Sequence, residues 1–266
     1  MGAVAIAVIG RGPERSDVLR ARGAGPLRLL CPRTAGGAAW IVTSSLGGGL
    51  VDGDRLALEV TIEPGATCVV TSQASTKVYR GASSLRTAVR VAGGATALVV
   101  PDPVVPFAGA RFEQVTELAL DAGASLALCD VVTAGRVAYG ERWSAARVAT
   151  TLELAIAGER VVLDRLLLER ARDAARRMRR FEALGTALLV GPRFADLAAA
   201  ELARLGAASL PRGAPVVVAG SPFPSRSDAA LFRVAGERVE AVVGAVRDLL
   251  RAACARAGQD PWARRW

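Results

Sequence analysis

One short pattern recurs at a fixed interval along the chain and restricts the possible folds more than any other feature. Each copy reads as a strand, a tight glycine-centred turn and a second strand, and the copies cover residues 60–71, 89–100 and 118–129. Their turn glycines are Gly65, Gly94 and Gly123, so both intervals, 94 − 65 and 123 − 94, are 29 residues. One interval earlier lies Gly36. A strand-rich period of this kind predicts stacked, β-helix-like coils or a layered β body, and regular hairpins in an ordinary β-sandwich are the alternative.

The later part of the chain predicts two helices among short strands. Proline suits the first turn of a helix, so a helix is expected over residues 192–205. The one-sided apolar pattern of Val239–Arg256 predicts a second, amphipathic helix. We therefore expect one mainly β domain over residues 1–266, with a β-rich body over about 1–185 and a small α/β segment over about 186–260.

The composition fits a folded protein without a membrane partner. Of the 266 residues, 52% are hydrophobic, and a chain near this size buries roughly three quarters of its unfolded surface. The apolar runs are far shorter than the ~20 residues that span a bilayer. The apolar stretch of residues 3–9 has no basic residue before it, unlike a secretory signal. We therefore expect a short strand there and a cytoplasmic protein.

The usual ligands of transition metals are scarce in this chain. It contains no histidine, which removes the commonest metal ligand and the usual general base. The cysteines form no C-x-x-C pair, so we expect them to be buried apolar residues in a reducing compartment. They are Cys31, Cys68, Cys129 and Cys254. Any metal chemistry must therefore rest on carboxylates, thiols or the backbone.

The charge is strongly basic and comes almost entirely from arginine. The net charge is +9 and the isoelectric point about 10.7, which suggests a partner with an acidic surface or a nucleic acid. Lys77 is the only lysine, the arginines are scattered outside residues 170–180, and aromatic side chains for base stacking are few. These features argue against a nucleic acid, and the dense arginine stretch is interpreted as a solvated face.

One acidic residue stands in a strand that otherwise reads as buried. Asp130 follows the apolar residues 126–129 and precedes two valines. A buried carboxylate has to be ion-paired or hydrogen-bonded, and Arg136 and Arg142 are the candidate partners. On the residues alone, we expect Asp130 to form a satisfied ion pair in the core.

Four motifs then follow one another along the chain. They are GGGLVDGD at residues 47–54, SQASTKVYR at 72–80, PDPVVPFAGARF at 101–112, and Asp130 with Gly135-Arg136 and Gly140-Glu141. In their order and intervals they closely resemble the motifs of the UreD (UreH) family of urease accessory proteins. The resemblance is strong over about residues 25–168 and weak in the C-terminal segment. Two positions depart from the family pattern: Cys129 stands where Trp is frequent, which should loosen the local packing, and Asp52 stands where Gly is usual.

The resemblance implies a protein that is not an enzyme. Members of this family are scaffolds with a β-helix-like body and two helices. They bind the urease apoprotein and the accessory protein UreF, which in turn recruits the GTPase UreG, and the assembly supplies nickel to the urease active site. The resemblance therefore implies no tightly bound cofactor, and only transient contact with Ni²⁺.

An internal passage for nickel is also implied by the resemblance. The residues it assigns by motif position are the passage carboxylates Asp54, Asp130 and Asp164, and the passage-lining or structural residues Thr76, Lys77 and Glu141. Ni²⁺ prefers imidazole or thiolate ligands, whereas sparse carboxylates bind an ion weakly enough to let it move on. The alternative for each aspartate is a structural hydrogen-bonding role.

Two other functions are kept open by the residues. A basic nucleic-acid-binding protein would show binding that weakens steeply with salt. A carboxylate-dependent hydrolase that uses Asp130 and Asp164 would need the two carboxyl groups within about 10 Å of each other in an open cleft.

Overall fold

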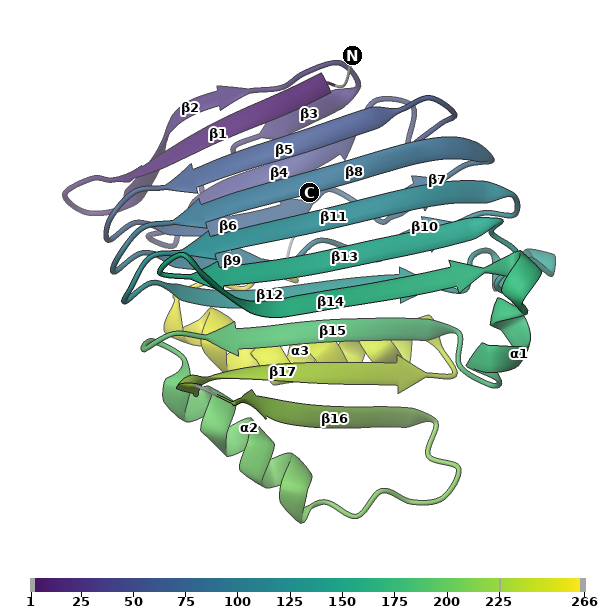
Figure 1. Ribbon diagram of the computed structural model, residues 1–266. Helices are drawn as coiled ribbons and strands as arrows, with labels where there is room; N and C mark the ends of the chain where they lie inside the picture. The colour runs from purple at the N-terminus through teal and green to yellow at the C-terminus, as the bar shows by residue number, and fades with distance from the viewer. Residues whose placement is uncertain (1–2, 225, 264–266) are drawn as a thin grey trace.

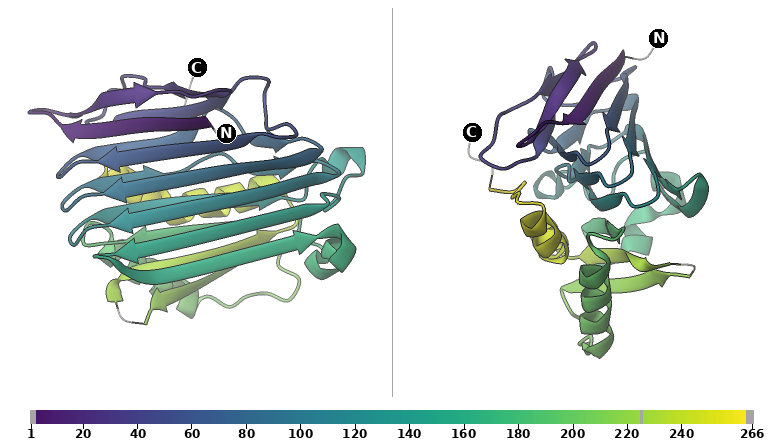
Figure 2. Two further views of the ribbon diagram at one scale, coloured as in Figure 1. Left: turned by 45° about the horizontal axis from the view of Figure 1, so that its top comes forward. Right: turned by 90° about the vertical axis from the view of Figure 1, so that its left-hand side faces the viewer.

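The computed structural model describes residues 3–224 and 226–263, which form two β-sheets and three α-helices (Figure 1). The sheet of seven strands forms an outer layer and is called the outer sheet. The sheet of ten strands is called the central sheet, because it lies between the outer sheet and two of the helices (Figure 2). Strands make up most of the ordered structure, which confirms the prediction of a mainly β protein.

The outer sheet contains, in spatial order, β14 (Glu159–Glu169), β13 (Arg147–Ile156), β11 (Ala110–Leu120), β8 (Gly81–Val91), β5 (Arg55–Ile62), β1 (Ala3–Arg11) and β2 (Ser16–Arg22). The central sheet contains β16 (Val216–Phe223), β17 (Arg226–Gly236), β15 (Ala183–Val190), β12 (Ser125–Thr133), β9 (Thr96–Val99), β6 (Thr67–Ser72), β4 (Ala39–Ser45) and β3 (Leu27–Leu30). Two short strands of the central sheet, β7 (Thr76–Val78) and β10 (Val104–Pro106), pair with each other, and β10 also pairs with β12.

Several neighbouring parallel strands in both sheets pair at the same offset. In the outer sheet, Val60 pairs with Val89 and Val89 with Leu118. In the central sheet, Val70 pairs with Val99. The partners in each of these pairs are 29 residues apart (89 − 60, 118 − 89 and 99 − 70). The interval that separates the turn glycines is therefore also the register of the parallel strands.

The two strands of each repeat belong to different sheets. β5 lies in the outer sheet and the next strand, β6, lies in the central sheet, and β8 with β9 and β11 with β12 follow the same rule. The hairpin alternative is therefore wrong for these repeats, because a hairpin pairs strands that are adjacent in the chain. The tight turn between the sheets is made at Gly65, Gly94 and Gly123, whose φ angles of 69°, 71° and 78° favour glycine.

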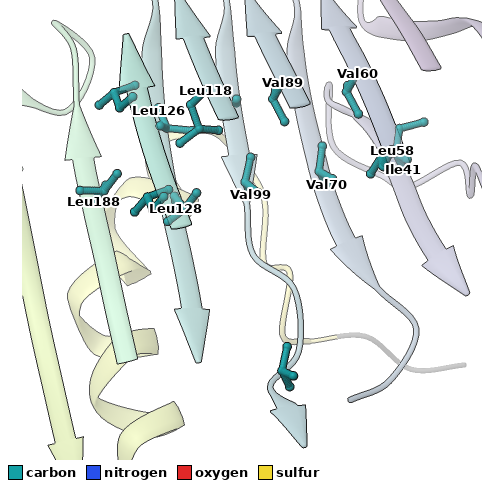
Figure 3. Close-up of a cluster of buried hydrophobic side chains, with 14 of the residues drawn as sticks. Ile41, Leu58, Val60, Val70, Val89, Val99, Leu118, Leu126, Leu128 and Leu188 are labelled. Carbon is teal, nitrogen blue, oxygen red and sulfur yellow. The ribbon is translucent and has the colours of Figure 1, made fainter. Parts of the chain in front are cut away.

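Apolar side chains fill two separate cores. Between the sheets, Leu58 and Leu118 of the outer sheet belong to one buried cluster with Ile41 and Leu126 of the central sheet (Figure 3). The second core lies between the central sheet and the helices and includes Phe232, which is fully buried. Alternate residues of a strand point to opposite faces, and strands of the central sheet contribute apolar residues to both cores. Burial of apolar surface on both faces of this sheet holds the three layers together.

The two long helices cover the far face of the central sheet. They are α2 (Ala195–Ala207) and α3 (Val239–Arg256), and α3 agrees with the predicted amphipathic helix. The predicted start of α2 at Pro192 is wrong by three residues. The chain turns first, because the backbone N–H of Arg193 donates to Ser125 Oγ of β12 over 3.1 Å and that of Phe194 donates to the Gly191 carbonyl over 3.0 Å. Among the described residues, no helix has both the length and the apolar character that a membrane span requires.

The arginine-rich stretch forms a short helical segment between β14 and β15. It contains the 3₁₀ turn η2 (Arg170–Arg172) and the third helix, α1 (Ala174–Met178). This segment projects from one end of the two sheets (Figure 1). The family resemblance implied two helices, and the structure adds this third, short one.

One expectation about the cysteines is wrong. Cys68, Cys129 and Cys254 are buried, as expected, but Cys31 is exposed. Cys31 follows directly after β3, the strand at the edge of the central sheet, so nothing in the two cores covers it.

Candidate functional site

Among the described residues, two neighbouring cavities share one acidic residue. The first has a volume of about 160 Å³ and lies between the two sheets. The second has a volume of about 180 Å³ and lies between β13 and β14 of the outer sheet and β15, β16 and β17 of the central sheet. Asp130, on β12, borders both cavities. The pair of cavities that meet at Asp130 is therefore the candidate functional site.

Asp130 is held by an amide from the opposite sheet. Nε2 of Gln114, on β11, donates a hydrogen bond to Oδ2 of Asp130 over 2.7 Å. Burial raises the pKa of Asp130 above its ordinary value, because the charged form loses its water. The Gln114 hydrogen bond opposes this rise, and the nearby charge of Asp164 adds to it. Asp130 is half-buried rather than buried because its side chain borders the cavities.

A row of polar side chains crosses the central sheet beside the second cavity. Strand pairing places Asp130 opposite Thr186 on β15, and Thr186 opposite Arg233 on β17. Nη1 of Arg233 donates to Oγ1 of Thr186 over 2.7 Å. Nη2 of Arg233 lies 2.5 Å from Oδ1 of Asp164, which belongs to β14 of the outer sheet. This ion pair joins the two sheets and brings a positive charge next to two carboxylates.

Hydroxyl-bearing side chains and the carboxylate of Asp102 border part of the first cavity. Oγ1 of Thr43 donates to the Thr71 carbonyl over 3.2 Å, and Oγ of Ser72 donates to Oδ2 of Asp102 over 3.2 Å. Thr76 also borders this cavity. The polar segment 71–80 is not simply a loop at the surface. It includes the end of β6 and all of β7, because β7 pairs with β10 and so closes over the first cavity.

The structure brings together some of the six residues singled out in the sequence and separates others. Asp130 and Asp164 border the second cavity, and Thr76 borders the first. The other three are bound or placed elsewhere. Oδ2 of Asp54 accepts a hydrogen bond from the Val51 backbone N–H over 2.9 Å within a turn, and Lys77 is exposed. Oε2 of Glu141 accepts hydrogen bonds from the Ala108 N–H over 3.1 Å and from Nε of Arg136 over 3.0 Å.

The predicted partners of Asp130 are wrong. Arg136 pairs with Glu141, five residues further along the chain, and Arg142 lies 3.6 Å from Glu182. The cation that acts on Asp130 is Arg233, which lies 103 residues away in the sequence (233 − 130) and lowers its pKa. The prediction failed because β17 is far from β12 in the sequence. In the central sheet, however, only β15 lies between the two strands.

Gln114 and Arg233 are the site residues that the sequence analysis missed. Gln114 lies between Phe112 and Leu118 on the inward face of β11. Together with Thr116 it interrupts an otherwise apolar set. Arg233 interrupts the apolar strand β17 in the same way that Asp130 interrupts β12. A polar residue at an inward strand position was thus a usable signal, because buried polar groups require a partner.

This arrangement can offer a cation only weak contacts with carboxylate oxygens. In the described part of the chain, no three Asp, Glu or Cys side chains gather into a group that could hold a metal ion. Two carboxylates beside one guanidinium carry little net charge, and carboxylate oxygen is not the ligand that Ni²⁺ prefers. The hydrolase alternative requires two carboxyl groups close together in an open cleft. Asp130 and Asp164 do border the same cavity, and Asp164 is ion-paired with Arg233.

Comparison with known proteins gives a consistent answer. The model of the UreD urease accessory protein family matches residues 2–266. The chain is 42% identical over 265 residues to the urease accessory protein UreD of Sorangium cellulosum (strain So ce56), covering 97% of this chain and 83% of that protein. It is 38% identical over 267 residues to the UreD protein of Anaeromyxobacter sp. (strain Fw109-5), covering 95% and 89%. It is 33% identical over 183 residues to urease accessory protein D of Arabidopsis thaliana, covering 65% and 62%.

Proposed function

Because the chain belongs to the UreD family of urease accessory proteins, we propose that it is a non-enzymatic scaffold that helps to load urease with nickel. It binds the urease apoprotein and UreF, and through UreF the GTPase UreG, and it works in the cytoplasm. Ni²⁺ is the cargo of this assembly and not a resident cofactor of the chain. The family assignment supports the role in urease maturation, and the interior cavities support the passage of the ion through this chain.

The observation that carries the proposal is the position of Asp130 between two cavities. Each cavity, at about 160 and 180 Å³, has room for several water molecules at about 30 Å³ each. A partly hydrated ion can therefore occupy either cavity. Asp130 is the acidic residue common to both, so an ion that moves from one to the other meets this carboxylate.

The charges near the second cavity favour transit over storage. With both carboxylates ionised, Asp130, Asp164 and Arg233 have a summed formal charge of −1 (−2 + 1). This charge attracts a cation but does not fix it, and conduction requires binding that is weak enough for the ion to leave. Thr76 contributes a neutral oxygen to the first cavity. Asp54 borders neither cavity, so an ion would meet it only outside them.

The body that encloses the cavities is proposed to be a β-helix-like winding. The register offset of 29 residues in both sheets supports this description, and so does the passage of the chain from one sheet to the other at each repeat. Such a winding surrounds an interior continuous along its axis. The cavities are then parts of that interior where the side chains are too small to fill it.

The test of the proposed function is urease maturation in cells that carry the urease operon. With the wild-type chain, urease should be active and loaded with nickel. Without the chain it should be inactive and free of nickel. Asp130→Ala should still form the complex with urease but deliver less nickel. The matched control is Asp248→Ala, on the exposed face of α3, whose side chain is 64% exposed. Urease that is fully loaded in the absence of the chain contradicts the proposal.

A further inference from the structure

The segment that carries the dense arginine stretch lies at one end of the two sheets (Figure 1), and its exposed arginines form a charged surface. It is called the arginine surface and consists of Arg170, Arg172, Arg176, Arg177, Arg179 and Arg180. All six side chains belong to the segment between β14 and β15, and all six residues are exposed. None of them borders either of the two cavities, so the proposed passage of nickel does not account for them.

The backbone beneath the arginine surface is held in place by a neighbouring loop. The guanidinium of Arg142 donates hydrogen bonds to the carbonyl oxygens of Arg179 and, over 3.0 Å, Phe181. Nε1 of Trp143, a buried residue, donates to the same Phe181 carbonyl over 2.9 Å. These bonds fix the end of the segment to the body.

The held conformation is also a costly one. Asp173 and Arg179 have φ angles of 59° and 49°, in the region that side-chain-bearing residues rarely adopt. Backbone strain of this kind costs of order 1–3 kcal/mol per residue and persists where the surroundings impose it, often at sites that bind something. Strain and anchoring in the same short segment indicate that the position of its side chains matters.

The carboxylates within the segment do not neutralise its arginines. Between Glu169 and Glu182 there are six arginines and three acidic residues, a net charge of +3 (6 − 3). Arg172 pairs with Glu169 over 2.7 Å, and Arg176 pairs with Asp173 over 2.6 Å. Arg170 and Arg177 form no ion pair within the described residues. Those two guanidinium groups are therefore available to an acidic partner.

An exposed aromatic residue stands on the loop that anchors this surface. Tyr139, three residues before Arg142, is 78% exposed. The guanidinium carbon of Arg136 lies 5.2 Å from the centre of the Tyr139 ring and 4.2 Å from that of Phe107, within the range of a cation–π contact. Tyrosine and arginine are enriched among the residues that contribute most to protein–protein binding. A large exposed Tyr beside fixed arginines therefore suits a protein partner.

We propose that the arginine surface and Tyr139 bind an acidic surface of a partner protein, and that this partner is one of the proteins of urease maturation. The identity of the candidate partners rests on the proposed function, whereas the location of the surface rests on the charge, anchoring and exposure described above. A nucleic acid fits less well. A single exposed Tyr offers little base stacking, and Glu169, Asp173 and Glu182 would repel phosphates along the same segment.

The test is a binding measurement with purified urease apoprotein and purified UreF, each titrated against the immobilised full-length chain at low and high salt. Arg170→Glu with Arg177→Glu should weaken binding of one of these proteins at least about tenfold, because close charge pairs across an interface contribute 1.4 kcal/mol or more. The control is Arg20→Glu with Arg22→Glu, which makes the same charge change at two exposed arginines of β2. It should bind as the wild type does. Tyr139→Ser, which changes no charge, should weaken the same partner.

The outcomes separate the two proposals. If the wild-type chain binds urease or UreF but the arginine variant binds both as well as the wild type does, the surface proposal is wrong and the proposed function stands. If the arginine and control variants lose the same affinity, overall charge is responsible and the surface is again refuted. If the wild-type chain binds neither protein, the proposed function itself fails, and this inference fails with it. Salt-sensitive binding of duplex DNA that only the arginine variant loses would assign the surface to nucleic acid instead.

Discussion

Replacing Arg233 by methionine should make the second cavity hold Ni²⁺ instead of releasing it. Arg233 borders this cavity, and its guanidinium binds Asp164 and Thr186. Methionine keeps a long apolar side chain but removes the charge. The summed formal charge of Asp130, Asp164 and residue 233 then changes from −1 to −2, and both carboxylates become available to a cation.

The size of the effect follows from the dimensions of the cavity. A sphere of 180 Å³ has a radius of about 3.5 Å, so an ion at its centre lies roughly 6 Å from a guanidinium on the wall. At that distance a divalent ion and a single positive charge repel by roughly 1.4 kcal/mol at the dielectric constant of water, and by more inside a protein. Removing the repulsion should tighten Ni²⁺ binding at least about tenfold. The side chain of Arg233 is 45% exposed, so losing its ion pair should cost only about 1 kcal/mol of stability.

The assay is equilibrium dialysis of the purified chain against Ni²⁺, followed by the rate of urease activation in cells. The matched control is Arg226→Met. Arg226 lies on the same strand and forms a comparable ion pair with Asp228 over 2.8 Å, but it borders neither cavity. Arg233→Met should bind nickel more tightly than the wild type and activate urease more slowly, whereas Arg226→Met should do neither. Equal nickel affinity in the two variants would refute the reasoning about the charge at this cavity.

Three further predictions concern stability and are measured by chemical unfolding. Because burial raises the pKa of Asp130 above 3.8, the stability that its neutral form contributes is lost as the pH rises through the raised value. Asp130→Asn should therefore gain stability relative to the wild type between pH 4 and 8, and a constant difference would contradict this. Gly135→Ala should cost about 2–3 kcal/mol, because φ is 97° and the new Cβ would lie 2.5 Å from the Pro106 carbonyl; an unchanged midpoint would count against it. Leu188→Ala, between the sheets, should cost about 2–5 kcal/mol, and a loss below 1 kcal/mol would show that this core is loosely packed.

The repeat was readable from the sequence because its cause is local. The turns at Gly65, Gly94 and Gly123 require positive φ, so glycine recurs wherever the chain passes from one sheet to the other. Parallel pairing at an offset of 29 residues then follows from the equal spacing of these turns. The assignment of α3 succeeded for a similar reason, since one apolar stripe along a helix is visible in the sequence itself.

The site was only partly readable because its contacts join distant parts of the chain. Asp130 and Asp164 were identified, but the cation next to them, Arg233, comes from β17, beyond β15 in the central sheet. The order of strands in space cannot be obtained from spacing alone, so nearby arginines were assigned to Asp130. In the structure Arg136 binds Glu141 instead, because the two residues share one loop and meet without any strand between them.

The arginine stretch was also only partly predictable from the sequence. Its interpretation as a solvated face described its exposure correctly. Its anchoring by Arg142 and Trp143 depends on residues about 30–40 positions earlier in the chain and could not be read from the stretch itself. Charge pattern thus predicts where a surface lies, whereas the contacts beneath it indicate whether its position is fixed.

The most direct test of the account is the nickel content per active site of urease matured with the Asp130→Ala chain, after the complex of that chain with urease has been verified. If the ion passes through the two cavities, this urease should contain clearly less nickel than urease matured with the wild-type chain or with Asp248→Ala. Full nickel loading by the Asp130→Ala chain would contradict the passage at Asp130 and leave the chain a scaffold that does not conduct the ion.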